Sequence, residues 1–404
     1  MSVTPKNAVV VGAGLVGAVS ALLLAQCGYR VTVVEQRSLR NKDVTALDPM
    51  SSKTIALSER SRLMLETADL WPDINCCSIK SVHVSELGKF GSVNIRADKL
   101  NMDALGFVVS NSEFELYLHQ RMRNESAITL IEDAKAVSVE HSEEKVCLGI
   151  MQQGTQQSIE TDLLIAADGT ESVVRALLQI DVQERDYNQC AVLANVMTSM
   201  PHSCTAYERF TGSGPLALLP QASSGKSHLY SMIFTAVEKD IQSLASMPDD
   251  CFLQLLQKRF GGKLGRFEKI GKRFVAPLKL VVSKKQTVGR CALIGNASRT
   301  LHPVAGQGLN LALRDVFELA ACLSVEDIDV CEVLENFSTD RRFDQQLVTR
   351  QTDLLARAFT DKPFPLQLPA NAARRMSLFL LDTVEPVKKS FATLNMGKHV
   401  SLPR

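Results

Sequence analysis

"GRCALIGNASRTLHPVAGQGLNLALRDV", residues 289–316, combines an apolar run, a loop that contains glycines, and a helical pattern. The run "CALIG" is typical of a short buried strand, whose end would deliver Asn296 to the edge of a site. A helix is expected from about Leu309 onward. Because glycine amides and a helix N-terminus stabilise negative charge, the loop predicts a site for an electron-rich group. The residues expected at this site are Gly295, Asn296, Gly306, Gln307, Gly308, Leu309 and Asn310.

Another glycine loop, "VVVGAGLVG", occupies residues 9–17; it is the first glycine loop of the chain, and the loop at residues 302–310 is the second. Gly12, Gly14 and Gly17 form G-x-G-x-x-G between an expected strand and an expected helix. In such a loop the first glycine permits the turn, the second lets a pyrophosphate approach, and the third lets the helix pack on the strand. Glu35 ends the next strand, where its carboxylate can accept from ribose hydroxyls and disfavours a 2′-phosphate. The unit therefore predicts a dinucleotide, either NAD or FAD.

A third stretch, "LLIAADGTESVVR" at residues 163–175, again indicates strand, turn and helix. It places Asp168 and Gly169 at the mouth of the strand and Arg175 one turn into the helix. Alone, this pattern equally fits an ordinary turn in which an Asp caps a helix. The two glycine loops together favour FAD over NAD, because a reduced flavin ring carries a negative charge that the loop at residues 306–310 would stabilise.

The three motifs, in this order and spacing, resemble the FAD-dependent aromatic hydroxylases of the p-hydroxybenzoate hydroxylase fold. Within that family the chain is most similar to the ubiquinone-biosynthesis hydroxylases, over nearly its whole length. Asn296 stands where the family usually has Asp, but "GNA", "TLHP" and "YERFTGSGPLALLP" (residues 207–220) resemble the branch that hydroxylates 2-polyprenyl-6-methoxyphenol. An Asn can still accept from a ribitol hydroxyl. Lys53 stands where the family often has Arg, which puts a flavin contact there in doubt.

The resemblance implies a chemistry carried by the cofactor. NAD(P)H would reduce FAD, O2 would add at the flavin C4a, and the resulting hydroperoxide would hydroxylate an activated phenol ring. The protein would position the ring and exclude water. His302 and Pro303 are expected on the reactive side of the flavin, where His302 either tunes a phenol proton or makes only a structural hydrogen bond, and Pro303 shapes the loop. Because there is a single G-x-G-x-x-G, NAD(P)H should bind transiently.

The resemblance and the element pattern predict an α/β fold: a Rossmann-like FAD-binding domain, an inserted antiparallel-sheet substrate domain and a helical C-terminus. A chain of 404 residues is too long for one ordinary core. Helices are expected at 111–123 and 249–260. The expected boundaries are 1–80, 111–185 and 286–345 for the FAD-binding domain, 81–110 and 186–285 for the substrate sheet, and 346–404 for the helical region.

Composition narrows the functional classes. The net charge is +1 and the basic residues are scattered, so nucleic acid is not an expected partner. Ten cysteines without C-x-x-C and seven histidines without ligand spacing favour reduced thiols, no metal site and a cytoplasmic protein. The apolar run "VGAVSALLLAQC", residues 16–27, could imitate a signal peptide, but its position between the glycine loop and a strand favours a buried helix.

The remaining predictions concern partners. A polyprenyl phenol lives in the bilayer, and residues 373–400 mix apolar and basic side chains. That segment would rest on the inner face of a membrane, bind other ubiquinone-biosynthesis enzymes, or simply pack on the FAD domain. Two alternatives to hydroxylation stay open: a related flavoprotein such as a prenyl reductase or halogenase, and a non-catalytic component of the biosynthetic complex. The ring carbon, the prenyl length, NADH versus NADPH and the oligomeric state are also left open.

Overall fold

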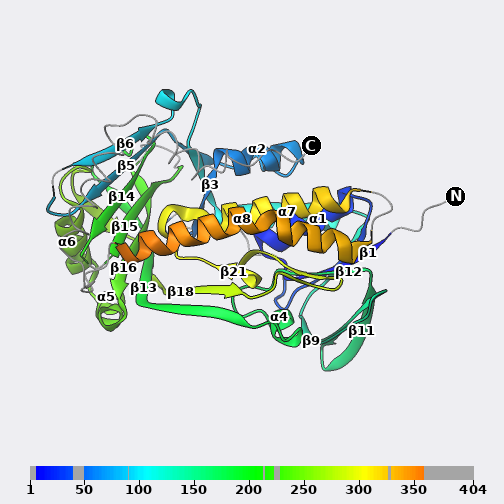
Figure 1. The fold of residues 1–404 in the computed structure, drawn as a ribbon. Coiled ribbons are helices and arrows are strands. Elements are labelled where there is room, and N and C mark those ends of the chain that lie inside the picture. Colours follow the sequence, from blue (N-terminus) through cyan, green and yellow to red (C-terminus); the bar gives the residue numbers. More distant parts are fainter. Residues whose placement is uncertain are drawn as a thin grey trace.

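The computed structural model describes residues 6–39, 50–89, 91–212, 214–222, 228–325 and 329–358. In the FAD-binding half, at the right of Figure 1, a largely parallel sheet has the strand order β19-β20-β12-β1-β2-β8. The strands are β1 (Asn7–Val11), β2 (Arg30–Val34), β8 (Ile128–Ile131), β12 (Leu163–Ala166), β19 (Thr287–Val288) and β20 (Cys291–Leu293). Since β20, β12 and β1 are adjacent and parallel, all three motif loops leave the same edge of the sheet.

Helices cover one face of this sheet, and a small antiparallel sheet covers the other. The helices are α1 (Leu15–Gln26), α3 (Asn111–Asn124), α7 (Gln307–Leu323) and α8 (Val330–Ala358); the small sheet has β9 (Ala134–His141), β10 (Val146–Gln152) and β11 (Thr155–Thr161), beside α4 (Val173–Leu177). Leu22, Leu23 and Leu24 of α1 are all buried. The prediction of a buried helix at residues 16–27 is therefore confirmed, as is the helix expected at 111–123.

The substrate sheet, at the left of Figure 1, has the order β21-β18-β13-β16-β15-β14-β5-β6, with β17 paired to β13. Its strands are β5 (Ser81–Glu86), β6 (Ser92–Arg96), β13 (Val182–Thr198), β14 (Thr205–Thr211), β15 (Gly214–Pro220), β16 (Leu229–Val237), β17 (Phe267–Ile270), β18 (Phe274–Ser283) and β21 (Arg299–Thr300). Helices α5 (Ile241–Ser246) and α6 (Asp249–Phe260) pack on its outer face. The helix expected at 249–260 is confirmed.

The long strand β13 connects the two halves. Figure 1 shows it running from the neighbourhood of α4 into the substrate sheet. It pairs with β18 over Val182–Leu193, on both sides of a register shift between Asp186 and Gln189. Asn188 in this bulge has a left-handed φ of 52°, and the bulge turns the Tyr187 side chain toward His302 and Asp353. The connection between the halves is thus hydrogen-bonded sheet.

One part of the expected organisation differs from the structure. Residues 106–110 were expected in the substrate sheet, but β7 (Gly106–Ser110) instead pairs with β3 (Thr54–Ser58) and β4 (Cys76–Ile79) in a separate small sheet. A Cβ on Gly106 would lie 2.5 Å from the Leu57 carbonyl oxygen, so the strands approach closely there. The run "GFVVS" is apolar on both faces, so its periodicity could not show which sheet it joins. Helix α2 (Glu59–Thr67) follows β3.

The expected boundary at residue 346 falls inside α8, so one helix continues across it. Buried ion pairs join this helix to α7: Arg341 contacts Asp315 and Asp344, and Arg314 contacts Asp344. Gln345 adds a hydrogen bond to Asp315. The helix after the second glycine loop is therefore tied to α8 by charges as well as by apolar packing. Residues 373–400, expected at a membrane or a partner, lie outside the described residues.

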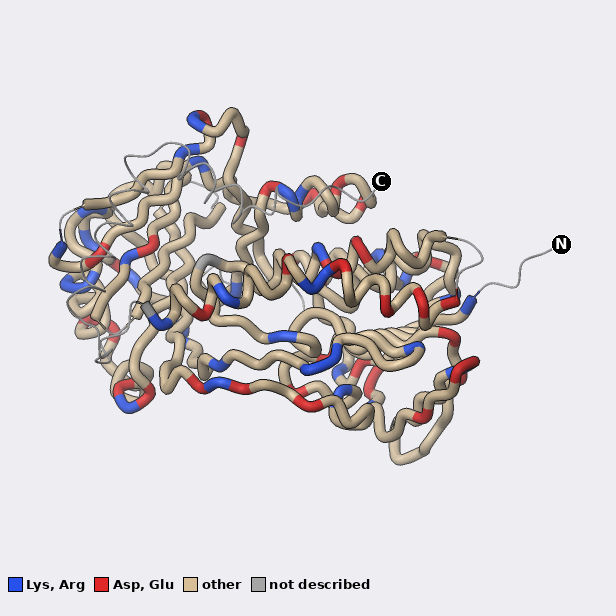
Figure 2. The backbone as a smooth tube through the Cα atoms, in the orientation of Figure 1, with Lys and Arg blue, Asp and Glu red and all other residues tan. Residues whose placement is uncertain are grey.

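Lys and Arg residues are interspersed with Asp and Glu residues along the described chain (Figure 2). Within that part of the chain, no helix is both long and apolar enough to cross a membrane. At the amino ends of β1 and β2, residues including Ala8, Gly28 and Thr161 line a pocket of about 660 Å³. This pocket lies at the edge of the sheet opposite the motif loops, whereas open α/β sheets bind ligands at the carboxyl ends of their strands.

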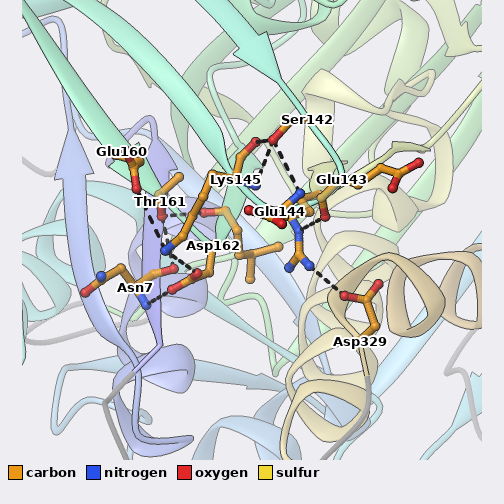
Figure 3. A network of polar contacts seen from close by, with 11 residues as sticks. Asn7, Ser142, Glu143, Glu144, Lys145, Glu160, Thr161, Asp162 and Asp329 are labelled. Carbon is orange, nitrogen blue, oxygen red and sulfur yellow. Dashed lines mark hydrogen bonds and ion pairs between the residues drawn. The ribbon is translucent and has the colours of Figure 1, made fainter.

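A polar network closes the amino-terminal edge of the sheet (Figure 3). The Asp162 carboxylate accepts the Asn7 N–H at 2.7 Å and pairs with Lys145 at 2.8 Å. Arg290 pairs with Asp329 and donates to the Glu143 carbonyl. Burial raises the pKa of Asp162, but hydrogen bonds from Lys145 and Asn7 lower it overall. All the groups in this network have partners within the chain, so they hold strands together.

Candidate functional site

The first glycine loop is shaped by two close contacts and one open position. A Cβ on Gly12, whose φ is +102°, would lie 2.5 Å from the Ala167 carbonyl oxygen, and one on Gly17 would lie 1.9 Å from the Gly12 carbonyl oxygen. A Cβ on Gly14, by contrast, would have no atom of the described residues within 4 Å. Gly12 and Gly17 are therefore required by packing, whereas Gly14 leaves room for a ligand at the N-terminus of α1.

Buried side chains hold this loop in place. Glu35 accepts the Ala13 N–H at 2.7 Å and also pairs with Arg37. Burial raises the pKa of Glu35, but the hydrogen bonds from Ala13 and Arg37 lower it overall, so the carboxylate stays ionised. His119 of α3 contacts the Ala13 carbonyl at 2.7 Å. The spacing of His119 in the sequence does not point to this loop, which lies more than a hundred residues away.

The second motif supplies a buried acceptor. Asp168, just after β12, accepts the Val174 N–H through Oδ2, while Oδ1 is buried without a hydrogen-bond partner among the described residues. Gly169 has a φ of +93° and open space where a Cβ would lie. Arg175 donates to the carbonyls of Thr170 and Ala297. It thus joins the second motif to the third, a role that its position in the sequence did not show.

The third motif lies against the first. Gly295 has a φ of +58°, and a Cβ there would meet Val16 of α1 at 3.1 Å. Asn296 follows in the short 3-10 helix η4 (Gly295–Ala297), and its side chain is exposed. The structure therefore brings Asn296 to the mouth shared by the two loops, as expected from the end of β20.

The second glycine loop ends in η5 (Val304–Gly306), which leads into α7. Gly306 has a φ of +60°, and nothing described lies within 4 Å of a Cβ on Gly308. Gln307 is buried, and Leu309 packs against the main core. The side-chain amide of Asn310 is engaged within the protein. Its side chain accepts from Ser58 and Ser61 and donates to Ala56 and Gly306, so its amide fastens the loop to β3 and α2.

His302 is buried among protein atoms. Its Nδ1 accepts the Val304 N–H at 3.1 Å, and Nε2 has no hydrogen-bond partner among the described residues. The Tyr187 ring packs edge-on at 5.2 Å, and burial lowers the pKa of His302 to about 4. The imidazole is therefore neutral at physiological pH and shapes the loop. Pro303 follows it, half-buried, and caps η5.

Lys53 contacts the substrate sheet. Its Nζ lies 4.9 Å from the centre of the Phe274 ring, and its carbonyl accepts the Asn111 N–H. Phe274 begins β18, so this cation–π contact joins the small sheet to the substrate sheet.

Three side chains that can bind metals meet although their spacing shows no motif. Ligand atoms of Cys77, His202 and Cys204 lie within 4.8 Å of one another. Both imidazole nitrogens of His202 are already engaged, because Nδ1 accepts the Cys204 N–H and Nε2 contacts the Gln221 carbonyl. Binding a metal would break one of these hydrogen bonds, so we assign the cluster a structural role at the turn between β13 and β14.

The residues present fit an FAD molecule. Gly14 and Gly308 leave open backbone at two neighbouring loops, and Asp168 offers a buried oxygen that has no donor within the described chain. Glu35 offers a buried carboxylate at the first loop. The backbone amides of the two loops suit a diphosphate and an electron-rich ring. The buried oxygens of Asp168 and Glu35 suit hydroxyl groups of the same ligand.

Comparisons with known proteins agree with this geometry. The chain is 28% identical to the ubiquinone hydroxylase UbiL of Rhodospirillum rubrum over 97% of this chain and 89% of that protein. It is also 28% identical to the uncharacterized protein slr1300 of Synechocystis, over 96% and 92% respectively. The solved structure of p-nitrophenol 4-monooxygenase PnpA from Pseudomonas putida superposes with a TM-score of 0.77 at 18% identity, covering 97% of this chain and 98% of that one.

The PnpA superposition shows the fold, which is the expected p-hydroxybenzoate hydroxylase-like arrangement of a Rossmann-like sheet, an antiparallel substrate sheet and helices. A family model described as an FAD binding domain matches residues 6–351. The chain therefore belongs to the FAD binding domain family, as one of its FAD-dependent aromatic monooxygenases.

Proposed function

We propose that this protein hydroxylates the ring of a polyprenyl methoxyphenol in ubiquinone biosynthesis, in the manner of a 2-octaprenyl-6-methoxyphenol hydroxylase. NAD(P)H and O2 would be its co-substrates. The observation that carries the proposal is the pair of open glycine positions, Gly14 and Gly308, at loops that leave one edge of the sheet. Support for the ubiquinone pathway comes from the motifs at 207–220 and 295–310 and from the likeness to UbiL.

Each end of the cofactor would have its own set of contacts. The amides at Gly12–Gly14 and the N-terminus of α1 would bind the diphosphate, and Glu35 would accept from the adenosine ribose. Asp168 and Asn296 would contact the ribityl chain and the diphosphate. The amides at Gly306–Gly308 and the N-terminus of α7 would stabilise negative charge on the ring. Bound FAD would supply the reduction of O2 and the transfer of one oxygen atom.

The protein's own contribution would be to place the phenol and exclude water. The substrate would lie between the inner face of the substrate sheet and the loop at residues 302–310. Phe210 of β14 packs with Val304 of that loop, so sheet and loop already meet there. An apolar wall beside the flavin would limit the access of water to the reacting atoms. NAD(P)H would bind only transiently.

The proposal extends to location. A polyprenyl substrate requires contact with the inner face of a membrane or with other enzymes of ubiquinone biosynthesis. We assign that contact to residues 373–400, on their sequence alone, because they combine apolar side chains with Arg374, Arg375, Lys388, Lys389 and Lys398.

The experiment uses the purified full chain loaded with FAD, lipid vesicles containing a polyprenyl methoxyphenol, and NADH or NADPH. We expect NAD(P)H oxidation with a product heavier by one oxygen atom. A product heavier by two hydrogens would indicate a reductase, and incorporation of chloride or bromide would indicate a halogenase. A yellow, reducible protein that changes none of these phenols would contradict the proposal in favour of a non-catalytic role. Identification of the quinone precursor that accumulates after gene deletion would define the step.

A further inference from the structure

Strand β14 presents alternate side chains to two different environments. Tyr207 packs edge-on against Phe260 of α6 with ring centroids 5.4 Å apart, and Arg209 donates to the Arg259 carbonyl at 3.0 Å. These two residues therefore face α6. Since side chains alternate along a strand, Glu208 must point to the opposite face. Phe210 shares that face and packs with Val304, in the loop before Gly306.

The surroundings of Glu208 are apolar. Its partners across the sheet are Val84 on β5 and Ala217 on β15. Oε1 is buried and has no hydrogen-bond partner among the described residues. A half-buried acid with one buried oxygen left without a donor in an apolar wall is costly and usually has a function.

Charged groups on this side of the sheet already have partners. Glu86 of β5, level with Phe210, pairs with Lys89. From α8, Asp353 pairs with Arg185, and Arg357 lies 3.7 Å from the same carboxylate. His302, in the loop at residues 302–310, is neutral. The side chains that β15 and β16 present to the face of Glu208 are apolar or carry a hydroxyl group. Burial alone raises the pKa of Glu208 to about 7.

We propose that Glu208 is a catalytic residue that binds the phenolic hydroxyl of the substrate and takes its proton. The inference rests on the proposed function, because it requires a phenol between the substrate sheet and the flavin loop. In the step, the phenol O–H bond breaks and its proton forms an O–H bond with the Glu208 carboxylate. The electron pair left on the phenolate oxygen enriches the ring carbon that accepts oxygen.

The energetics suit this role. A general base works best when its pKa lies near the working pH, which a carboxyl group attains through burial. His302 is the weaker base of the two, because burial lowers its pKa to about 4 and its Nδ1 is already engaged. Glu208 is the stronger base, and it lies on the face that meets the loop.

The test compares FAD-loaded wild-type protein with Glu208→Gln, Glu208→Asp and a control, Glu184→Gln. Gln keeps the size of Glu but cannot accept a proton, and Asp keeps the carboxyl. Glu184 lies on the exposed part of β13, paired with Lys279. The kcat for the polyprenyl phenol and the Kd of 2-methoxyphenol, followed by flavin absorbance, are measured from about pH 5 to 9.

For wild type we expect kcat to rise with pH through an apparent pKa near 7. Glu208→Gln should lower kcat by about 10²- to 10⁴-fold and remove that dependence, and Glu208→Asp should restore part of both. Glu184→Gln should behave as wild type. FAD content and Tm, measured on each variant, establish that it is folded.

A Glu208→Gln variant with the wild-type kcat and pH profile would overturn the role of Glu208 and leave the proposed function intact. If wild type hydroxylates no phenol, the proposed function fails, and the binding data still decide whether Glu208 holds phenols. In that case, a pH-dependent Kd for 2-methoxyphenol that Glu208→Gln abolishes would support the site, and identical binding by both proteins would refute it.

Discussion

The Ala13 N–H donates to Oε2 of Glu35 across 2.7 Å, so the carboxylate that follows β2 also fixes the first glycine loop. The same carboxylate binds Arg37, and both oxygens are therefore engaged before any ribose hydroxyl arrives. The shape of the loop depends on this side chain, and so would the ribose binding that we propose for it.

Glu35→Gln should weaken both functions. Because the folded-state pKa of Glu35 is lowered below 4.5, its charge stabilises the fold at pH above about 4.5, and the stabilisation is lost as pH falls through the lowered pKa. At neutral pH we expect a loss of about 1–2 kcal/mol in unfolding free energy, measured with urea, and a raised Kd for FAD. Equal stability of variant and wild type at pH 7 would contradict this.

Gly14→Ala and Gly17→Ala form a matched pair within one loop. A methyl group at Gly14 meets nothing described within 4 Å, so this variant should fold with near-normal secondary structure but bind FAD at least about 10-fold more weakly. At Gly17 the methyl group would lie 1.9 Å from a carbonyl oxygen, so this variant should be destabilised and poorly soluble. Circular dichroism and FAD titration separate the two effects. Unchanged FAD affinity in Gly14→Ala would argue against a ligand there.

Asp344→Asn should destabilise the contact between α7 and α8. It removes the charge that pairs with Arg314 and one of the two charges that pair with Arg341, and both arginines are almost fully buried. Breaking a buried ion pair from one side costs about 3–5 kcal/mol, which urea unfolding would detect. The control is Asp98→Asn, at an exposed pair with Arg96, where no measurable change is expected. A difference between the two variants below about 1 kcal/mol would show that the buried network contributes little.

Glu208→Gln should stabilise the substrate-free protein at high pH. The carboxyl titrates near 4.5 when unfolded and near 7 when folded, so wild type loses stability as pH rises between these values. The variant escapes this loss, and its advantage above about pH 7 should reach at most about 3 kcal/mol and vanish below pH 4.5. Tm measured along a pH series checks the trend. Parallel curves for the two proteins would mean that the buried carboxyl has an ordinary pKa.

The motif loops could be predicted from the sequence because the structure of each loop follows from residues that are close together in the chain. G-x-G-x-x-G before a buried helix, and "ALIGN" before a glycine loop, each combine turn chemistry with periodicity. The helices at 111–124 and 249–260 followed from the same periodicity. Where the pattern was ambiguous, as for Gly106–Ser110, pairing between distant strands decided the outcome.

The side chains whose roles could not be predicted from the sequence form hydrogen bonds with residues that are far away in the chain. Asn310 was expected at the cofactor, but its amide is used by Ser58, Ser61 and Ala56, about 250 residues earlier. His119 and Arg175 likewise act on loops far away in sequence. Glu208 looked like one polar residue in an alternating strand, and only the packing of Tyr207 and Arg209 on α6 shows which way it points.

The passage of β13 from one half of the molecule into the other limits how the enzyme can move. Because β13 is hydrogen-bonded to its neighbouring strands, it resists bending between the two halves. A domain closure, in which one half rotates toward the other, would therefore require these hydrogen bonds to break. Opening of the proposed site would then depend on smaller segments, such as the short glycine turns at Gly12–Gly17 and Gly306–Gly308. Substrate entry would be controlled by these turns while the sheet keeps its shape.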